Sequence, residues 1–388
     1  MNENMRKKSK IAFIKYLGLI TAGTEKFLQT IAAGLPKNEF EVDFYWAHPE
    51  EIPPDEGRIK YLQGNGVNLI EFKTSKPRVH RGKIWLDETN FFDVFKGADL
   101  IQTGRCGHFE EPFCSIKNIP IVDSYHYVVG VDNQYNTSRV MHISEFSKRK
   151  WIEMGGDESR IVMVSHPMII PKTEFINYRQ ELGLENKFVF GFHQRNDDAI
   201  FSDIPLKAYK EVENDNNAFV LLGGGEAYKK QASELGLKNI YFLPHTGDVN
   251  KIHSFLQIID VYAHGRKDGE LNSTAIAEAM YYGKPIVSHY SDSFNGHVEC
   301  IGNAGWVEQD YLQYAFKLHE LEIDPGLYQA IQPLIKKQFN EMYDYKNQMQ
   351  NIIKIYRDVI KNPYPNKLKR LYLDIKQQFP LRRHRRWN

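Results

Sequence analysis

DVYAHGRKDGELNSTAIAEAMYYGKPIVSH, residues 260–289, is the stretch that decides the fold. Two short apolar runs at its ends, Asp260–His264 and Pro285–His289, are typical of buried strands. Between them, a polar loop leads into an apolar-periodic segment that predicts a helix. Strand, loop, helix and strand in this order make one βαβ unit of a parallel sheet. The stretch therefore predicts an α/β protein.

Two glutamates in this unit stand where a ligand would bind. Glu270 lies in the loop, and Glu278 follows eight residues later, about one turn into the predicted helix. Ligands of parallel sheets bind beyond the carboxyl ends of the strands, where loops lead into helix N-termini. We therefore expect Glu270 to face a ligand site. The alternative is an ordinary amphipathic helix with solvated glutamates.

The whole stretch resembles the E-x7-E signature of retaining GT-B glycosyltransferases, family 4 in particular. The resemblance rests on Glu270, on Glu278-Ala279-Met280 and on the segment Gly283-Lys284-Pro285-Ile286-Val287. It implies an α/β fold of two Rossmann-like, doubly wound domains that face a central cleft. It also implies an enzyme that transfers a hexose-like sugar from a nucleotide sugar to an acceptor.

The same resemblance implies roles for the residues of the signature. Glu270 would be catalytic and hydrogen-bond the transferred sugar, and Glu278 would bind the ribose hydroxyls of the donor. The residues at the start of the predicted helix would approach the sugar and its phosphates through their backbone, since helix N-termini attract anions. These nucleotide-sugar-binding candidates are Leu271, Asn272, Ser273 and Thr274.

Arg195 is the candidate for binding the donor diphosphate. It follows the apolar strand candidate Lys187–Phe192, at the place where related enzymes have an arginine, and a guanidinium can bind phosphate with two hydrogen bonds. The family usually has a lysine five residues later, whereas this chain has Ile200 there, so Lys207 is a candidate replacement. The alternative for Arg195 is a surface ion pair with a neighbouring aspartate.

Two further candidates lie in the first half of the chain. Gly23 closes a loop, Gly18–Gly23, that resembles the glycine-containing turn of family 4 enzymes, although Ala22 replaces one of the expected glycines. The alternative is a plain tight turn. His126 follows a strand candidate at the position where the family has a histidine close to the transferred sugar, so it is a second catalytic candidate. The alternative is a structural histidine.

Length and alternation predict the domain organisation. A chain of 388 residues is long enough for about two domains, and strand and helix patterns alternate on both sides of the polar stretch 171–186. We expect an acceptor-side Rossmann-like domain at 1–170 and a nucleotide-sugar domain at 171–345. Residues 346–388 would form C-terminal helices that cross back to the first domain, followed by a basic tail.

The C-terminal tail is the one strongly charged segment. Residues 361–388 contain nine lysines and arginines against the single acid Asp374, whereas the whole chain has a net charge of only +1. A basic amphipathic tail suits an anionic membrane surface. Packing on its own domain is the alternative, and no nucleic-acid-binding module accompanies the tail.

Other features favour a cytoplasmic protein, and the basic tail is a candidate for peripheral contact with a membrane. The three cysteines, without a C-x-x-C pair, argue against a disulfide or zinc framework. The apolar run near the N-terminus is interrupted by Lys15 and has no A-x-A cleavage site, so a signal peptide is not expected. No run of 18 apolar residues predicts a membrane span.

The predicted reaction needs no cofactor or metal. The chain has no D-x-D motif of the kind that holds a metal on the donor diphosphate, so positive charge would come from arginine, lysine and helix amides. The donor would be a UDP- or GDP-sugar and the acceptor a glycan or lipid-linked molecule. The alternatives are a GT-B-fold sugar-nucleotide epimerase and a degenerate protein that binds a sugar nucleotide or a partner without catalysis.

Overall fold

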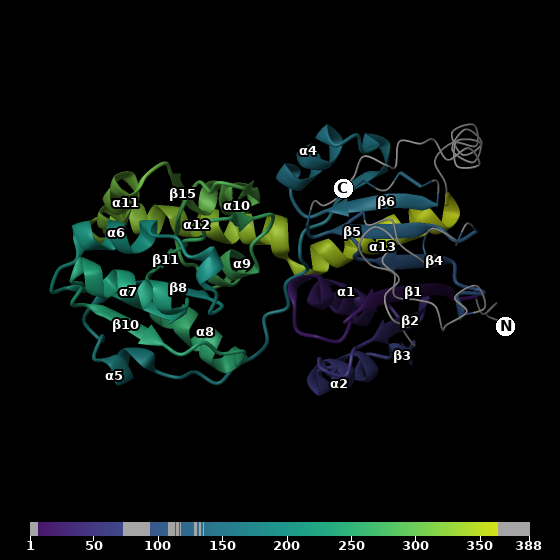
Figure 1. Cartoon of the computed structure of the whole chain (residues 1–388), viewed down its shortest axis with the longest axis horizontal. Helices are drawn as coiled ribbons and strands as arrows, with labels where there is room; N and C mark the ends of the chain where they lie inside the picture. The colour runs from purple at the N-terminus through teal and green to yellow at the C-terminus, as the bar shows by residue number, and fades with distance from the viewer. Residues whose placement is uncertain are drawn as a thin grey trace. The chain divides into compact units, whose positions relative to one another are not determined.

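The computed structural model describes residues 7–72, 94–107, 113, 116, 118–127, 130, 131, 133, 134 and 136–363. The chain divides into two compact units, the first formed by Met1–Pro167 with Gln348–Asn388 and the second by Met168–Asn347. Each unit contains one large parallel sheet accompanied by helices (Figure 1). The predicted membrane-binding tail lies outside the described residues from residue 364 onward.

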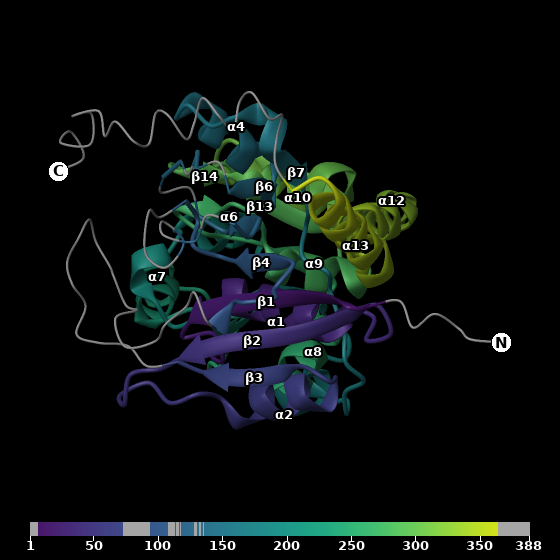
Figure 2. The same cartoon turned by 90° about the vertical axis from the view of Figure 1, so that its right-hand side faces the viewer.

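The first unit contains a seven-stranded sheet with the strand order β3-β2-β1-β4-β5-β6-β7. Figure 2 shows β1, β2 and β3 side by side, with α2 next to β3. The strands are β1 (Ser9–Tyr16), β2 (Phe40–Ala47), β3 (Asn68–Glu71), β4 (Leu100–Thr103), β5 (Ile121–Tyr125), β6 (Thr137–His142) and β7 (Ile161–Met163). The described helices are α1 (Gly23–Gly34), α2 (Glu56–Gly64), α4 (Glu145–Glu153), the short 3-10 helix Glu158–Arg160, and α13 (Tyr345–Lys361), which belongs to this unit from Gln348 onward.

The sequence of β1 explains why it lies inside this sheet. Its central residues Ile11–Ile14 are completely buried between β2 and β4, as expected for a parallel strand covered on both faces. Helix α13 is amphipathic, and its buried stripe includes Tyr356. The hydroxyl of Tyr356 donates a 2.8 Å hydrogen bond to the buried side chain of Gln102 on β4, so the interior polar groups at this contact are paired.

The second unit contains a six-stranded parallel sheet with the order β10-β9-β8-β11-β13-β15, and a separate two-stranded pair, β12-β14. The strands are β8 (Phe188–Gln194), β9 (Asn217–Gly223), β10 (Ile240–Leu243), β11 (Val261–Ala263), β12 (Gly269–Glu270), β13 (Ile286–His289), β14 (Phe294–Asn295) and β15 (Gly305–Glu308). The helices are α5 (Tyr178–Leu182), α6 (Ile204–Val212), α7 (Glu226–Leu235), α8 (Val249–Ile258), α9 (Thr274–Tyr281), α10 (Gly296–Ile301), α11 (Tyr311–Ile323) and α12 (Pro325–Tyr343), with 3-10 turns at Asp198–Ile200 and Gly302–Ala304.

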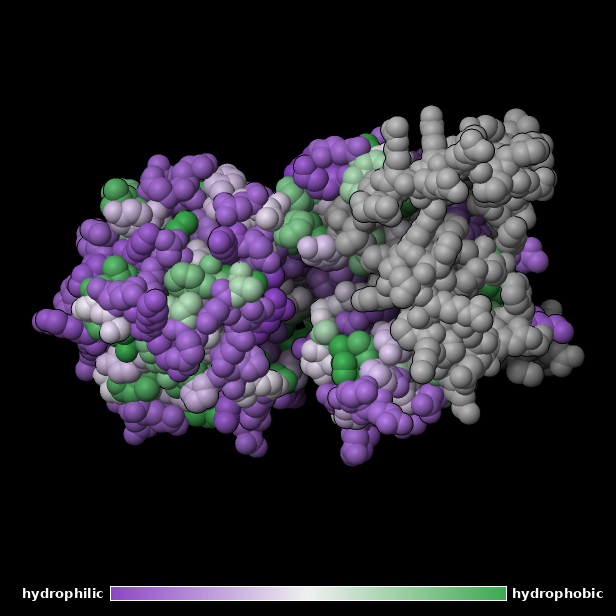
Figure 3. Space-filling model, viewed as in Figure 1, coloured by the Kyte–Doolittle hydropathy of each residue, from purple (hydrophilic) through white to green (hydrophobic). Residues whose placement is uncertain are grey.

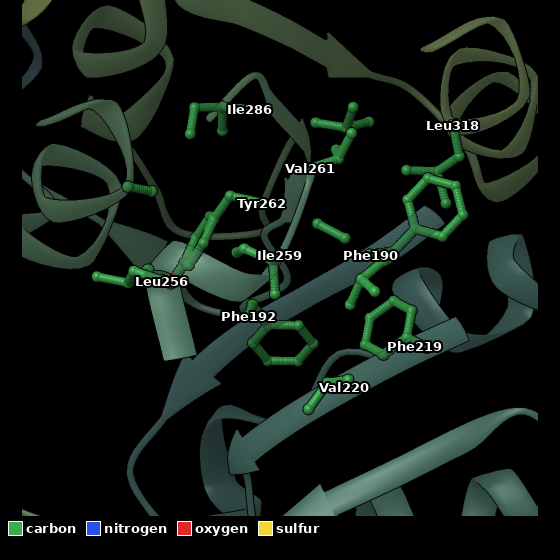
Figure 4. Close-up of a cluster of buried hydrophobic side chains, with 14 of the residues drawn as sticks. Phe190, Phe192, Phe219, Val220, Leu256, Ile259, Val261, Tyr262, Ile286 and Leu318 are labelled. Atoms are coloured by element: carbon green, nitrogen blue, oxygen red, sulfur yellow. The ribbon is translucent and has the colours of Figure 1, made fainter. Parts of the chain in front are cut away.

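Aromatic and branched side chains fill the core of the second unit (Figure 4). Phe192 packs edge-on against Phe219 of the neighbouring strand, with ring centroids 6.0 Å apart. Gly191 precedes Phe192 on β8. A Cβ atom at Gly191 would lie 2.3 Å from the carbonyl oxygen of Val220 and 3.0 Å from the side chain of Ile259. A glycine is therefore required for β8 to pack this closely. The face of this unit seen in Figure 3 is mostly hydrophilic, in keeping with an apolar interior.

Both sheets have the same winding. In each unit the second and third strands lie on one side of the first strand, and the fourth strand lies on its other side. The fourth strand is β4, beside β1, in the first unit and β11, beside β8, in the second. This 3-2-1-4-5-6 order is that of a doubly wound Rossmann sheet. The predicted α/β fold class with two Rossmann-like domains is confirmed.

Two smaller observations complete the fold. Cys106 and Cys300 are free, buried thiols, and Cys114 lies outside the described residues. Across the ranges that the structure describes, there is no helix with the length and hydropathy needed to cross a bilayer.

Candidate functional site

A cavity lies in the second unit at the carboxyl ends of β8, β9 and β11. It has a volume of about 260 Å³, close to the lower end of small-molecule sites, which is about 300 Å³. The strand order reverses between β8 and β11, which is where ligands of doubly wound sheets bind. The lining residues are Phe192, His193, Gln194, Arg195, Ile200, Leu222, His245, Thr246, Ile252, Tyr262, His264, Gly265, Arg266, Glu270, Thr274 and Ala275.

The cavity brings together several of the residues predicted from the sequence. Arg195, Glu270 and Thr274 line it directly, and Glu278 contacts the lining residue His193. Leu271, Asn272 and Ser273 connect Glu270 to α9 but are not among the lining residues. Ser273 is the N-cap of α9, and its buried hydroxyl accepts a hydrogen bond from the amide of Ile276 at 3.3 Å.

Glu270 is held by a histidine. Its Oε1 atom lies 3.3 Å from Nε2 of His264, which follows β11, and its side chain is 18% exposed. Burial raises the pKa of Glu270, but the hydrogen bond to His264 and the positive charge of Arg266 outweigh that effect and keep the pKa below its usual value. The carboxylate is therefore ionised near neutral pH and can accept hydrogen bonds from ligand hydroxyl groups.

Glu278 has the same kind of partner on the neighbouring strand. Its Oε2 atom lies 3.2 Å from Nε2 of His193, at the end of β8. Tyr262 of β11 lies between the two histidines in the sheet, with its ring centroid 5.7 Å from that of His193 and 6.3 Å from that of His264. Each glutamate of the signature is thus paired with a histidine at the end of one of the two central strands.

Two arginines line the cavity. Arg195 forms an ion pair with Asp197 at 2.8 Å, the alternative considered from the sequence, and its side chain is 59% exposed. Arg266 is more buried, 23% exposed, and makes two hydrogen bonds of 2.6 and 3.0 Å to Asp268. A guanidinium has five donors, so each arginine retains hydrogen-bonding capacity toward an anion.

Lys207 is placed differently from the arginines. It lies on α6, forms an ion pair with Asp203, and is not among the residues that line the cavity. Ile200 is buried and lines the cavity, and its carbonyl accepts a 3.2 Å hydrogen bond from the amide of Lys267. That bond brings the loop that carries Arg266 next to position 200. Arg266 is therefore better placed than Lys207 to supply a second cation.

The other two predicted residues lie in the first unit. His126 follows β5, and its ring packs edge-on against Phe27 with centroids 4.6 Å apart and lies 5.3 Å from the ring of His166. Its Nε2 atom is buried without a hydrogen-bond partner among the described residues. Burial, with smaller contributions from His166 and Lys15, lowers the pKa of His126 well below its usual value, so the ring is neutral near pH 7.

Gly23 is the first residue of α1. A Cβ atom at this position would meet nothing within 4 Å, so the fold of the first unit does not require a glycine there. The helix N-cap, Ala22, makes no side-chain capping bond, which leaves the first amides of α1 without that partner.

Among the cavity residues that were not predicted from the sequence are His193, Tyr262, His264 and Arg266. All four lie within or just after β8 and β11, so the rule that ligands bind at the carboxyl ends of central strands could have identified them. Among the residues that the structure describes, no three His, Cys, Asp or Glu side chains are grouped to hold a metal ion.

Comparisons with known proteins bear on this site. Residues 174–338 match the family model described as "Glycosyl transferases group 1", a range that contains every residue lining the cavity. A search of curated proteins found no match.

Solved structures share the fold. HepE from Anabaena in complex with UDP superposes with a TM-score of 0.71 at 19% identity, covering 90% of this chain and 100% of that one. The same protein with UDP-glucose gives a TM-score of 0.69 at 18% identity, covering 90% and 99%. A glycosyltransferase from Rickettsia africae gives 0.68 at 15% identity, covering 92% and 100%. These similarities confirm the GT-B fold class, and the family-model match supports the predicted enzyme class, a glycosyltransferase.

Proposed function

We propose, starting from the glycosyl transferases group 1 match of residues 174–338, that this chain transfers a sugar from a nucleotide sugar bound in the cavity of the second unit. The observation that carries the proposal is that two glutamates, each bonded to a histidine, and two arginines lie at the point where the strand order reverses. Carboxylates accept hydrogen bonds from sugar and ribose hydroxyls, and guanidinium groups donate hydrogen bonds to the oxygens of a diphosphate.

The preferred donor is a UDP-sugar. Solved structures that share the fold carry UDP, UDP-glucose, or UDP together with glucose. A GDP-sugar is the alternative, because the groups assigned here to the ribose and the diphosphate do not distinguish the two bases. The base itself would be recognised elsewhere in the site.

Each group of the site has a role in the proposed reaction. Glu278 accepts hydrogen bonds from the ribose diol, and Glu270 accepts them from hydroxyls of the transferred sugar. Leu271, Asn272, Ser273 and Thr274 approach the donor through their backbone at the N-terminus of α9.

The departing diphosphate needs positive charge in the transition state. We assign this role to Arg195 and Arg266, with help from the amides at the start of α9, so that no metal is required. Transfer would retain the anomeric configuration through attack by the acceptor on the face that the diphosphate leaves. The acceptor would be a glycan or a lipid-linked molecule.

The first unit would serve the acceptor side. His126 has a neutral ring and a buried Nε2 atom without a partner among the described residues, a group that can hydrogen-bond a hydroxyl. Gly23 would allow a ligand to approach the start of α1, where an added Cβ atom would meet no protein atom within 4 Å.

Product analysis with a labelled donor tests this function. The full-length protein is incubated with radiolabelled UDP-glucose or GDP-mannose, with EDTA or with Mn²⁺, and with a panel of glycan and lipid-linked acceptors. Sugar transfer or donor hydrolysis that persists in EDTA and is lost in Glu270→Ala supports a metal-independent transferase. Release of an epimerised sugar would instead identify an epimerase, and binding without any turnover would identify a non-catalytic binder.

A further inference from the structure

We infer that His264 is a positioning residue that, together with Ser288, sets which oxygen of Glu270 faces the ligand. The inference rests on the proposed function only for the identity of that ligand, the sugar of the donor. The geometry comes from a chain of hydrogen bonds that starts inside the sheet of the second unit and ends at the cavity. Neither His264 nor Ser288 belongs to the signature from which the site was predicted.

The chain of hydrogen bonds runs through three side chains. Ser288 Oγ lies 2.8 Å from His264 Nδ1, and His264 Nε2 lies 3.3 Å from Glu270 Oε1. Ser288 is completely buried and His264 is 4% exposed, so water cannot readily replace either partner. The three residues come from β13, from the residue after β11, and from β12.

The direction of these hydrogen bonds follows from their chemistry. An ionised carboxylate can only accept, so the Nε2 atom of His264 must carry the hydrogen in the bond to Glu270. In a neutral ring, Nδ1 then accepts from the hydroxyl of Ser288, which fixes the tautomer. In a charged ring, Nδ1 donates to Ser288 instead, and the bond to Glu270 keeps its direction.

The backbone on both sides of the chain is also fixed. The amide of His264 donates to the carbonyl of Val287 at 2.8 Å, and its carbonyl accepts from the hydroxyl of Tyr314 at 3.1 Å. Gly269, before Glu270, has φ of 67°, and a Cβ atom there would lie 1.8 Å from the carbonyl oxygen of Phe294. Only glycine fits, so the β12–β14 pairing holds Glu270 in one place.

As a consequence, one carboxylate oxygen of Glu270 is hydrogen-bonded to the protein and the other can accept a hydrogen bond from a ligand. Oε1 is bonded to His264, whereas Oε2 has no hydrogen-bond partner within the part of the chain that the structure describes. Because Glu270 lines the cavity, its free oxygen can accept a hydroxyl of the ligand without first giving up a protein contact. Without His264, the carboxylate would be free to rotate and would bind that hydroxyl less well.

Measuring the affinities for UDP and UDP-glucose by calorimetry separates positioning from folding. The wild type is compared with His264→Phe, which keeps a ring but has no donor, and with His264→Gln, whose amide can still donate. The matched control is His253→Phe, because His253 is also buried and makes a 2.8 Å hydrogen bond, to Tyr282, but does not line the cavity.

We expect the ratio of UDP-glucose affinity to UDP affinity to fall about tenfold in His264→Phe, with UDP affinity changed by less than about twofold. His264→Gln should restore most of the ratio, and His253→Phe should leave it unchanged. An unchanged ratio in His264→Phe, or an equal loss of both affinities, would overturn the inference.

Two further outcomes keep the test decisive. If His264→Phe does not fold, Ser288→Ala takes its place, and the ratio should fall by about threefold because the ring loses its inner anchor. No change in a folded Ser288→Ala would then overturn the inference. If the wild type binds no nucleoside diphosphate or sugar donor at all, the proposed function fails, which is distinct from binding that is indifferent to His264.

Discussion

The Oε2 atom of Glu278 lies 3.2 Å from the Nε2 atom of His193, although 85 positions separate the two residues in the chain. His193 stands near the end of β8 and Glu278 in the middle of α9, and the parallel pairing of β8 with β11 brings these elements together. The second glutamate of the signature is therefore fixed by the central strand of its own unit. Glu270 and Glu278 are thus each bonded to a histidine at the end of one of two neighbouring strands.

Replacement of Glu278 by glutamine should weaken nucleotide binding. The amide keeps the size of the side chain but accepts hydrogen bonds from a ribose diol less strongly than a carboxylate, so we expect UDP affinity to fall about tenfold. Isothermal calorimetry measures the effect. Glu234→Gln, at an exposed position on α7, is the control and should bind like the wild type. Equal affinities in both variants would argue against a ribose contact.

The two arginines of the cavity should contribute to the affinity for the diphosphate of UDP and not to the affinity for the nucleoside. Arg195→Ala and Arg266→Ala should each lower UDP affinity by about tenfold, because each removes a charged donor, while uridine binding changes little. Lys207→Ala tests the candidate from the sequence. Its exposed ion pair with Asp203 lies outside the cavity, so we expect less than about a twofold change. A larger effect of Lys207→Ala than of Arg266→Ala would reverse this assignment.

Gly191→Ala should destabilise the second unit. The added methyl group would lie 2.3 Å from the carbonyl oxygen of Val220, and we expect a loss of about 1–3 kcal/mol in the free energy of unfolding. Gly64→Ala is the matched control, since a Cβ atom there meets nothing within 4 Å at the end of α2. Urea denaturation of both variants checks the prediction, and equal stabilities would show that β8 can shift to make room.

Acid should destabilise the first unit through His142. Burial, with a smaller contribution from Lys148, lowers the pKa of this histidine from 6.5 to about 3. The unfolded chain therefore binds a proton that the folded chain does not between these values, and stability falls as pH falls through this window. The slope for one group is about 1.4 kcal/mol per pH unit.

The contribution of His142 is isolated by comparing variants. His142→Asn keeps a polar group toward Ser147, which lies 2.7 Å from Nδ1 in the wild type, but does not titrate. The free energy of unfolding should depend less steeply on pH in this variant between about pH 6 and pH 4. His319→Asn, at an exposed position on α11, is the control. Parallel pH profiles for the wild type and His142→Asn would contradict the prediction.

Much of the fold could be predicted from local patterns. The apolar runs at 260–264 and 285–289 became β11 and β13, because a strand buried on both faces needs a continuous apolar sequence. The turn into a helix after Glu270 became the N-terminus of α9, with Ser273 as its cap. These features depend on neighbours in the sequence and so appear in it directly.

The partners of the signature residues could not be predicted in this way. That His193 meets Glu278, and His264 meets Glu270, depends on β8 and β11 being neighbours, which is a property of the strand order and not of either segment. The same holds for Arg266, whose loop is bonded to the backbone of Ile200. The local sequence shows which residue types follow each strand, whereas the strand order determines which of these side chains contact one another.

The most direct test of the central claim is a crystal structure of this protein with UDP, or with GDP if UDP does not bind. We predict that the ribose hydroxyls lie within hydrogen-bond distance of Glu278 and that the diphosphate contacts Arg195 or Arg266 at the carboxyl ends of β8 and β11. A nucleotide that binds elsewhere on the chain and contacts none of these side chains would contradict the account.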